Sequence, residues 1–154
     1  MSLAAEVQIA GLATRGGLTI LVAEDNEADA HLISHALSAM STVGRVVCVR
    51  DGVEALATLT RDALMPDMAF IDLRMPRMDG FDLMSALAAR PQWTFPMVLT
   101  SSMAARDAAR SRLHSAVRVV TKPDSALELR AVLVAAINAV CPAPHVAGLR
   151  AGAG

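Results

Sequence analysis

The strongest candidates for chemistry in this chain are acidic residues that end or directly follow short apolar runs. Asp72 ends the run Met68–Asp72, and Glu24 and Asp25 follow the run Leu18–Ala23. Short apolar runs bounded by turn residues predict buried strands. Because open α/β sheets bind ligands at the carboxyl ends of their strands, Asp72 is the leading candidate for a reacting group.

A hydroxyl and a cation follow two later runs in the same way. Thr100 ends the apolar run of residues 95–100, and Lys122 comes shortly after the run of residues 117–120. In a doubly wound sheet these ends share one edge, which gathers the acids, the hydroxyl and the amine. Clustered carboxylates repel each other, and their oxygens suit Mg²⁺, which offsets the repulsion and attracts a phosphoryl group. Thr100 and Lys122 can then bind phosphoryl oxygens.

The elements that must position these residues alternate along the chain. Strands are predicted over residues 18–23, 45–50, 68–72, 95–100 and 117–120. Helical patterns follow each of them, with Leu32 and Val53 counted among their apolar faces and a weaker pattern over residues 104–115. Strands that alternate with helices predict a parallel sheet covered on both faces.

Composition narrows the class of protein. The 154 residues are 54% hydrophobic and 19% charged, with a formal net charge of −1. That balance predicts a packed core and gives no electrostatic case for nucleic acid or an anionic membrane as partner. No apolar run approaches the roughly 20 residues of a membrane span. The two cysteines suit a reducing cytoplasm. We expect a flexible extension over residues 1–17, one domain over residues 18–140 and a disordered tail over residues 141–154.

Four motifs in order give the chain a family resemblance. LTILVAEDN, AFIDLRMPRMDG, VLTSS and TKP occur in this sequence from residue 18 to residue 123. With them the chain resembles a stand-alone, chemotaxis-regulator-like receiver domain of bacterial two-component response regulators, over about residues 18–140. The resemblance implies a flavodoxin-like, doubly wound (βα)5 fold whose five-stranded parallel sheet has the order 2-1-3-4-5.

The resemblance also implies roles for the candidate residues. Asp72 would accept a phosphoryl group from a sensor histidine kinase or phosphotransfer protein, with Thr100 as the switch hydroxyl and Lys122 as the site's cation before a cis Pro123. Oxygen atoms would hold Mg²⁺ or Mn²⁺, namely those of the Glu24, Asp25 and Asp72 side chains and the Arg74 main-chain carbonyl. Such a protein turns over no separate substrate and catalyses only its own phosphorylation and dephosphorylation.

Further partners follow from the same resemblance. The phosphorylated domain would switch contacts with a downstream protein target. No DNA-binding segment follows Val140, so direct DNA binding is not expected, and neither is membrane association. Dimerisation through the last two helices is compatible with the fold.

Two positions depart from the usual pattern of this family. Val119 stands where many relatives carry an aromatic residue that moves together with the switch hydroxyl, so the usual readout is in doubt. Arg74 lies two positions after the acceptor, where it could pair with a phosphoryl oxygen or with Glu24 and lengthen the phosphorylated lifetime.

Alternative functions remain open at this point. One is a degenerate receiver that acts as a phosphorylation-independent binding module, and Val119 is the observation that suggests it. Another is an aspartate-based phosphatase of the haloacid-dehalogenase type, but Arg74 occupies the position of the second acid it needs. Ser101 could replace Thr100 if the strand register slips by one residue. His31 and His35 could form half a metal site, although a solvated helix face explains them better.

Overall fold

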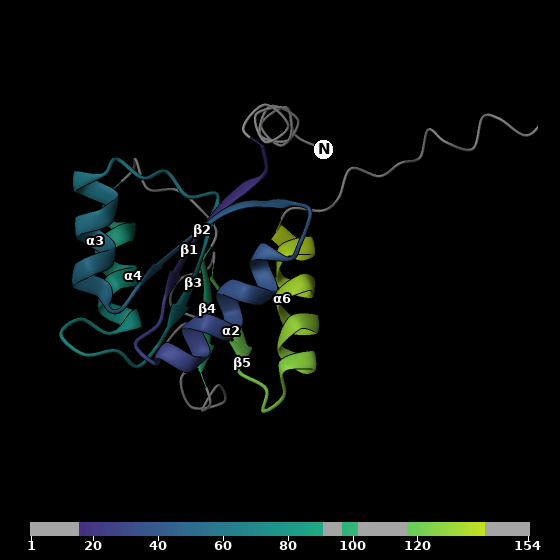
Figure 1. Cartoon of the computed structure of the whole chain (residues 1–154). Helices are drawn as coiled ribbons and strands as arrows, with labels where there is room; N and C mark the ends of the chain where they lie inside the picture. The colour runs from purple at the N-terminus through teal and green to yellow at the C-terminus, as the bar shows by residue number, and fades with distance from the viewer. Residues whose placement is uncertain (1–15, 91–96, 102–116, 141–154) are drawn as a thin grey trace, which may run out of the picture.

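The computed structural model describes residues 16–90, 97–101 and 117–140 (Figure 1). The strands are β1 (Leu18–Ala23), β2 (Val43–Val49), β3 (Met68–Asp72), β4 (Met97–Ser101) and β5 (Val117–Thr121). The helices are α2 (Glu27–Ser38), α3 (Gly52–Arg61), α4 (Gly80–Ala88) and α6 (Ala126–Val140). The terminal segments predicted to be flexible, and the helix predicted over residues 104–115, lie outside the described residues.

All neighbouring strands of the sheet are parallel. Their order is β2-β1-β3-β4-β5, as predicted. The chain moves from β1 outward to β2 and then returns past β1 to form β3. The strand order therefore reverses between β1 and β3, which is where open α/β sheets form a crevice for ligands. Glu24 follows the first of these two strands, and Asp72 ends the second.

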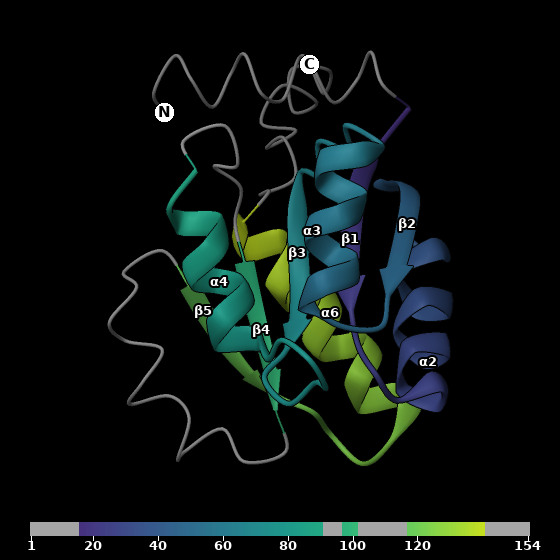
Figure 2. The same cartoon turned by 90° about the vertical axis from the view of Figure 1, so that its left-hand side faces the viewer.

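Helices cover both faces of the sheet. Helices α3 and α4 lie on one face, in front of the sheet in Figure 2, and α2 and α6 lie on the other face. Two apolar clusters fill the layers between the helices and the sheet, and every residue of β3 is buried. Burial on both faces explains why β1 and β3 read as nearly continuous apolar runs. None of the described helices is long and apolar enough to cross a membrane.

Strand alternation places the candidate residues on one face. In β3, Met68 and Phe70 pack in the cluster beneath α2 and α6, whereas Ala69 and Ile71 pack toward α3 and α4. Asp72 has the parity of Phe70, since side chains two apart in a strand share a face. At the end of β1, Glu24 has the same relation to Val22, which also lies beneath α2 and α6. Both carboxylates therefore belong to the α2/α6 face.

Side-chain caps begin three of the helices close to this edge. Asn26, Asp51 and Asp79 each accept a hydrogen bond from the main-chain N–H three residues further on, at α2, α3 and α4 respectively. These bonds satisfy amides that the first turn of a helix leaves without partners. Residues 24–26 and 50–51 alone separate α2 and α3 from the preceding strands, whereas residues 73–79 form a longer loop before α4.

Three local predictions were wrong. Leu32 and Val53 are 42% and 40% exposed, because Ile33, Leu37, Ala55 and Leu59 occupy the buried positions of their helices. Strand β2 is Val43–Val49, so it begins before the predicted start at residue 45, and Gly44 lies inside it. A side chain at Gly44 would collide with the main-chain oxygen of Gly16, at 2.4 Å from its Cβ. Glycine there allows close backbone approach within a strand.

Gly80 holds the loop after β3 against the end of that strand. A Cβ at this position would lie 2.6 Å from the carbonyl oxygen of Asp72 and 2.9 Å from the Cα of Leu73. The Gly80 N–H also donates to the Leu73 carbonyl at 3.1 Å. The start of α4 is therefore packed against the backbone of Asp72 itself.

Replacing Gly80 with alanine should destabilise the protein by about 1–3 kcal/mol, because the contacts are with backbone and cannot be relieved by a rotamer change. Urea unfolding followed by circular dichroism measures the change. Ser85→Ala, an exposed change in the same helix, should stay within about 0.5 kcal/mol of wild type. Equal midpoints for Gly80→Ala and wild type would contradict the close approach.

Candidate functional site

Three carboxylates meet at the carboxyl edge of β1 and β3. One carboxylate oxygen from each of Glu24, Asp25 and Asp72 can be chosen so that all three lie within 4.8 Å of one another. Glu24 and Asp72 are 3% and 7% exposed, and Asp25 is exposed. The Glu24 carboxylate accepts a hydrogen bond from the Asn26 N–H at 3.2 Å, which orients it at the start of α2. The predicted acids are thus brought together.

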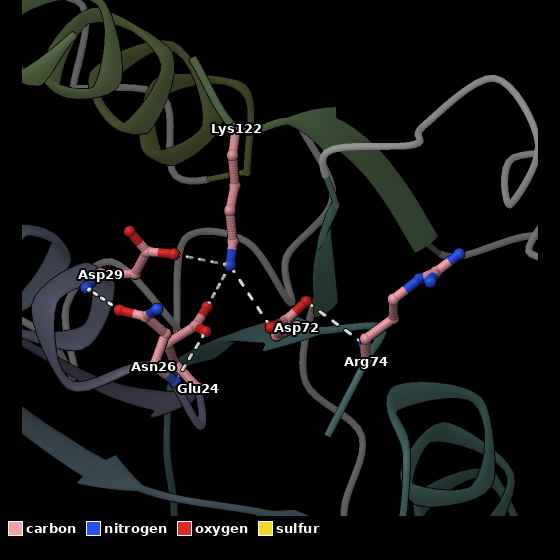
Figure 3. A network of polar contacts seen from close by, with 6 residues as sticks. All are labelled: Glu24, Asn26, Asp29, Asp72, Arg74 and Lys122. Atoms are coloured by element: carbon pink, nitrogen blue, oxygen red, sulfur yellow. Dashed lines mark hydrogen bonds and ion pairs between the residues drawn. The ribbon is translucent and has the colours of Figure 1, made fainter. Parts of the chain in front are cut away.

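Lys122 reaches into this cluster from the loop after β5 (Figure 3). Its ammonium lies 2.5 Å from a Glu24 oxygen, 3.3 Å from an Asp72 oxygen and 3.4 Å from an Asp29 oxygen. Three carboxylates contact this ammonium, and Asp25 adds a fourth carboxylate beside Glu24 and Asp72, so one lysine does not balance the charge of the cluster. The remaining negative charge favours a further cation.

Burial and charge shift the pKa values in this cluster. Burial, helped by the neighbouring Asp72 carboxylate, raises the pKa of Glu24 from 4.5 to about 7, although Lys122 opposes the shift. Burial alone would lower the pKa of Lys122, but its hydrogen bond to Glu24 and the charges of Asp72, Glu24 and Asp29 outweigh that effect and raise it. Lys122 is therefore positively charged at neutral pH.

Thr100 lies beside Asp72 in the sheet. The two residues are Cα partners in the pairing of β3 with β4, while Ser101 lies one residue further along, opposite Thr121 of β5. Partners in a parallel ladder share a face of the sheet. Thr100 is 5% exposed, and its carbonyl accepts a hydrogen bond from the Leu73 N–H at 3.1 Å. The register therefore brings Thr100 rather than Ser101 next to Asp72.

Arg74 contributes its backbone rather than its charge to the described site. Its N–H donates to a carboxylate oxygen of Asp72 at 3.2 Å. Figure 3 shows its side chain extending away from Glu24 and Asp72. The pairing of Arg74 with Glu24, one of the two options expected from the sequence, is therefore not seen.

The end of β5 differs from one expectation. The described residues contain no cis peptide bond, so the bond before Pro123 is trans and the cis expectation was wrong. The trans form is the lower in energy even before proline, by roughly 0.5–1 kcal/mol. Val119 is half-buried and packs against the cluster beneath α3 and α4. It sits on the opposite face of β5 from Val120, which packs beneath α2 and α6.

Sequence reasoning missed one residue of the cluster. Asp29 contacts Lys122 from the first turn of α2, and its backbone N–H is already bound to Asn26. A signal was present, because α2 directly follows Glu24 and must cover the same face of the sheet. His31 and His35 stack at 6.2 Å between ring centroids on the exposed side of α2. They belong to no three-ligand group among the described residues.

The donor set fits a divalent cation. It consists of carboxylate oxygens from two neighbouring strand ends, and it carries more negative charge than Lys122 can balance. Hard oxygen ligands of this kind favour Mg²⁺ or Mn²⁺ over metals that prefer sulfur or nitrogen.

The fold and site together define a class of protein. It is a doubly wound α/β domain with an acidic cluster, a hydroxyl and a lysine at its topological switch point. Residues 20–134 match the family described as response regulator receiver domain, and the chain belongs to that family. Members are phospho-acceptor signalling modules of two-component systems, which interact with histidine kinases and downstream targets.

Individual relatives agree with the family match. The chain is 32% identical over 117 residues to the probable methanogenesis regulatory protein FilR2 of Methanothrix harundinacea, covering 72% of this chain and 76% of that one. The phosphorylated cyanobacterial phytochrome response regulator RcpA is 29% identical with a TM-score of 0.73, covering 82% and 95%. The Mn²⁺-bound response regulator Rcp1 is 25% identical with a TM-score of 0.65, covering 79% and 92%. The chain spans only 24% to 52% of the length of several other curated relatives.

The raised pKa of Glu24 has a definite sign for stability. The unfolded chain loses the Glu24 proton near pH 4.5, whereas the folded protein keeps it to about pH 7. The stability that Glu24 contributes therefore falls as pH rises through this window. Glu24→Gln removes the effect and should make the metal-free protein about 1–3 kcal/mol more stable than wild type at pH 8, with a smaller gain at pH 5.

Chemical denaturation in a chelating buffer at both pH values measures these differences. Glu27→Gln is the matched control and should change stability little, since Glu27 forms an exposed ion pair with Arg50. A Glu24→Gln protein less stable than wild type at pH 8 would contradict the assignment of a strained, crowded carboxylate.

Proposed function

We propose that this chain is a phospho-acceptor module in which Asp72 takes a phosphoryl group from a histidine kinase or phosphotransfer protein. The observation that carries the proposal is the contact of Lys122 with both Glu24 and Asp72 at the switch point of the sheet. Thr100, the partner of Asp72 in the adjacent strand, adds a hydroxyl beside the acceptor.

The transfer forms one bond and breaks one bond. A carboxylate oxygen of Asp72 attacks the phosphorus atom, and the bond from phosphorus to the donor atom breaks, with its electron pair leaving on the donor. The product is an acyl phosphate, a covalent intermediate of high transfer potential. Lys122 stabilises the negative charge on the phosphoryl oxygens, and the Thr100 hydroxyl donates a hydrogen bond to one of them.

The acidic residues would hold the divalent cation of this reaction. Glu24, Asp25 and Asp72 supply carboxylate oxygens, and the Arg74 main-chain carbonyl is the fourth protein ligand in this proposal. When bound, Mg²⁺ or Mn²⁺ neutralises charge on the transferring group. The Mn²⁺-bound state of the related Rcp1 supports this part of the proposal.

Phosphorylation would change the surface that a downstream protein binds. The added charge on Asp72 draws Lys122 and Thr100 toward it, which biases a switch in the β4 and β5 region. Val119 cannot act as an aromatic relay, so the signal would pass through displacement of the backbone near Thr100. In this proposal the module is the domain of residues 18–140, it works in the cytoplasm, and it binds neither DNA nor membrane.

The acceptor role predicts a single covalent adduct. Incubation with Mg²⁺ and acetyl phosphate should add one phosphoryl group to the protein, seen by intact mass, and the adduct should be absent in Asp72→Asn. Asp82→Asn, an exposed acid on α4, is the matched control and should be modified like wild type. An adduct of equal yield in Asp72→Asn would overturn the assignment.

The same experiment separates the alternatives. A phosphatase would consume the donor in many turnovers without accumulating an adduct. A binding module without phosphorylation would give no adduct, yet would bind its partner equally well with and without Mg²⁺.

The strand register makes a second prediction. Thr100→Ala removes the hydrogen bond to a charged phosphoryl oxygen, which is worth about 1.5–3 kcal/mol, so phosphorylation should slow by roughly tenfold or more. Ser101→Ala should stay within about twofold of wild type, because Ser101 is not the register partner of Asp72. Quenched time courses with a labelled phosphodonor measure the phosphorylation rates of both variants. A larger loss in Ser101→Ala than in Thr100→Ala would assign the hydrogen bond to Ser101.

A further inference from the structure

An ion pair outside the cluster of Glu24, Asp25, Asp72 and Lys122 holds the loop that follows Asp72. The guanidinium of Arg77 lies 2.7 Å from one Asp51 oxygen through Nε and 2.6 Å from the same oxygen through Nη2. The Asp51 side chain is 5% exposed, whereas that of Arg77 is 61% exposed. The Arg77 side chain therefore links the loop between β3 and α4 to a buried carboxylate at the start of α3.

Asp51 is held from two directions. One of its oxygens accepts the N–H of Glu54 at 2.9 Å, which caps α3, and the other accepts Arg77. Burial alone would raise the pKa of Asp51, but the backbone hydrogen bond from Glu54 and the pair with Arg77 outweigh it and lower the pKa. The carboxylate is therefore a fixed, charged anchor.

The backbone beside Arg77 makes a second tie to α3. The Gly52 N–H donates to the Met78 carbonyl at 3.1 Å. The Met78 side chain lies so close to Gly52 that a Cβ there would be 2.5 Å from it. Arg77 itself has φ of 62°, in the left-handed region that residues other than glycine rarely adopt. The residue thus holds an unfavourable backbone conformation while its side chain is paired.

The other end of this loop is the acceptor site. The Leu73 N–H is bound to Thr100, the Arg74 N–H to Asp72, and the Gly80 N–H to the Leu73 carbonyl. Few residues separate these bonds from Arg77. Rotation of the loop at Arg77 would therefore move the backbone of Arg74 and the carboxylate that it contacts.

We propose that Arg77 is a positioning residue, whose ion pair with Asp51 holds the loop so that the Arg74 carbonyl and the Asp72 carboxylate face the cation and the phosphoryl group. The inference rests on the proposed function, since it concerns the same site. It adds a role for two residues that lie outside the acid cluster.

Long-range charge and local positioning predict opposite results, which makes the inference testable. Removing a cation near an acidic cluster raises divalent-cation affinity by charge alone. Removing a residue that orients the ligands lowers it, typically by a factor of ten or more. Arg77→Gly removes the ion pair and also relieves the left-handed backbone, so a loss of affinity in this variant comes from positioning.

The experiment measures Mn²⁺ affinity by electron paramagnetic resonance, together with urea unfolding, in full-length protein. Arg77→Gly and Asp51→Asn should each weaken Mn²⁺ binding by roughly tenfold. Arg77→Lys, which keeps the charge but not the planar fork, should recover part of the affinity. The double variant should be no weaker than the single variants, because both remove one interaction. Arg50→Gln removes an exposed pair with Glu27 and should bind Mn²⁺ as tightly as wild type or more tightly.

Three outcomes would overturn the inference in different ways. Wild-type affinity in Arg77→Gly, with a phosphoryl adduct still formed by wild type, would remove the positioning role and leave the proposed function intact. A wild-type protein that neither binds Mn²⁺ nor accepts a phosphoryl group would remove the proposed function and this inference with it. Loss of affinity only in parallel with loss of folded protein would assign the pair to stability alone.

Discussion

Electrostatic repulsion among carboxylates is the constraint on which the rest of this structure depends. Glu24 and Asp72 are buried side by side because two neighbouring parallel strands end at the same edge. Lys122, which follows β5, offsets part of that repulsion because its ammonium contacts both Glu24 and Asp72. Apolar packing on both faces of the sheet holds the strand ends in place, so the core stabilises an arrangement of charges that is unfavourable by itself. A cation bound at such a site would reduce the repulsion among the carboxylates, and this reduction would favour its binding.

The sequence predicted the fold and three acids of the cluster, Glu24, Asp25 and Asp72, because both follow from local rules. Apolar runs mark the strands, and the polar residues at or directly after their ends, such as Glu24 and Asp72, mark one edge of the sheet. The four ordered motifs, through family resemblance, added the strand order, which the structure has. These inferences needed no knowledge of long-range packing.

The features that were missed depend on distant parts of the chain. The contact of Asp29 with Lys122 requires the packing of α2 against the loop after β5, and the Arg77 pair requires a left-handed turn that places a side chain over α3. Leu32 followed a helical period but lies at the edge of its buried face, where no described element covers it fully. The trans bond before Pro123 was missed for another reason. The expectation of a cis bond came from the family resemblance and not from the residues around Pro123.

The caps on α2, α3 and α4 have a consequence for how an anion is held. A helix carries a partial positive charge at its amino end, which many phosphate-binding proteins direct at their ligand. Here that charge is already matched within each helix, by a capping side chain and by acids in the first turn such as Asp29, Glu54 and Asp82. The partial positive charges at the amino ends of these three helices are therefore already balanced by the protein's own polar and acidic side chains. In the proposed function, the charge that phosphorylation adds at Asp72 would therefore be neutralised by Lys122 and a divalent cation rather than by a helix amino end, so that removing the cation would leave this charge unbalanced.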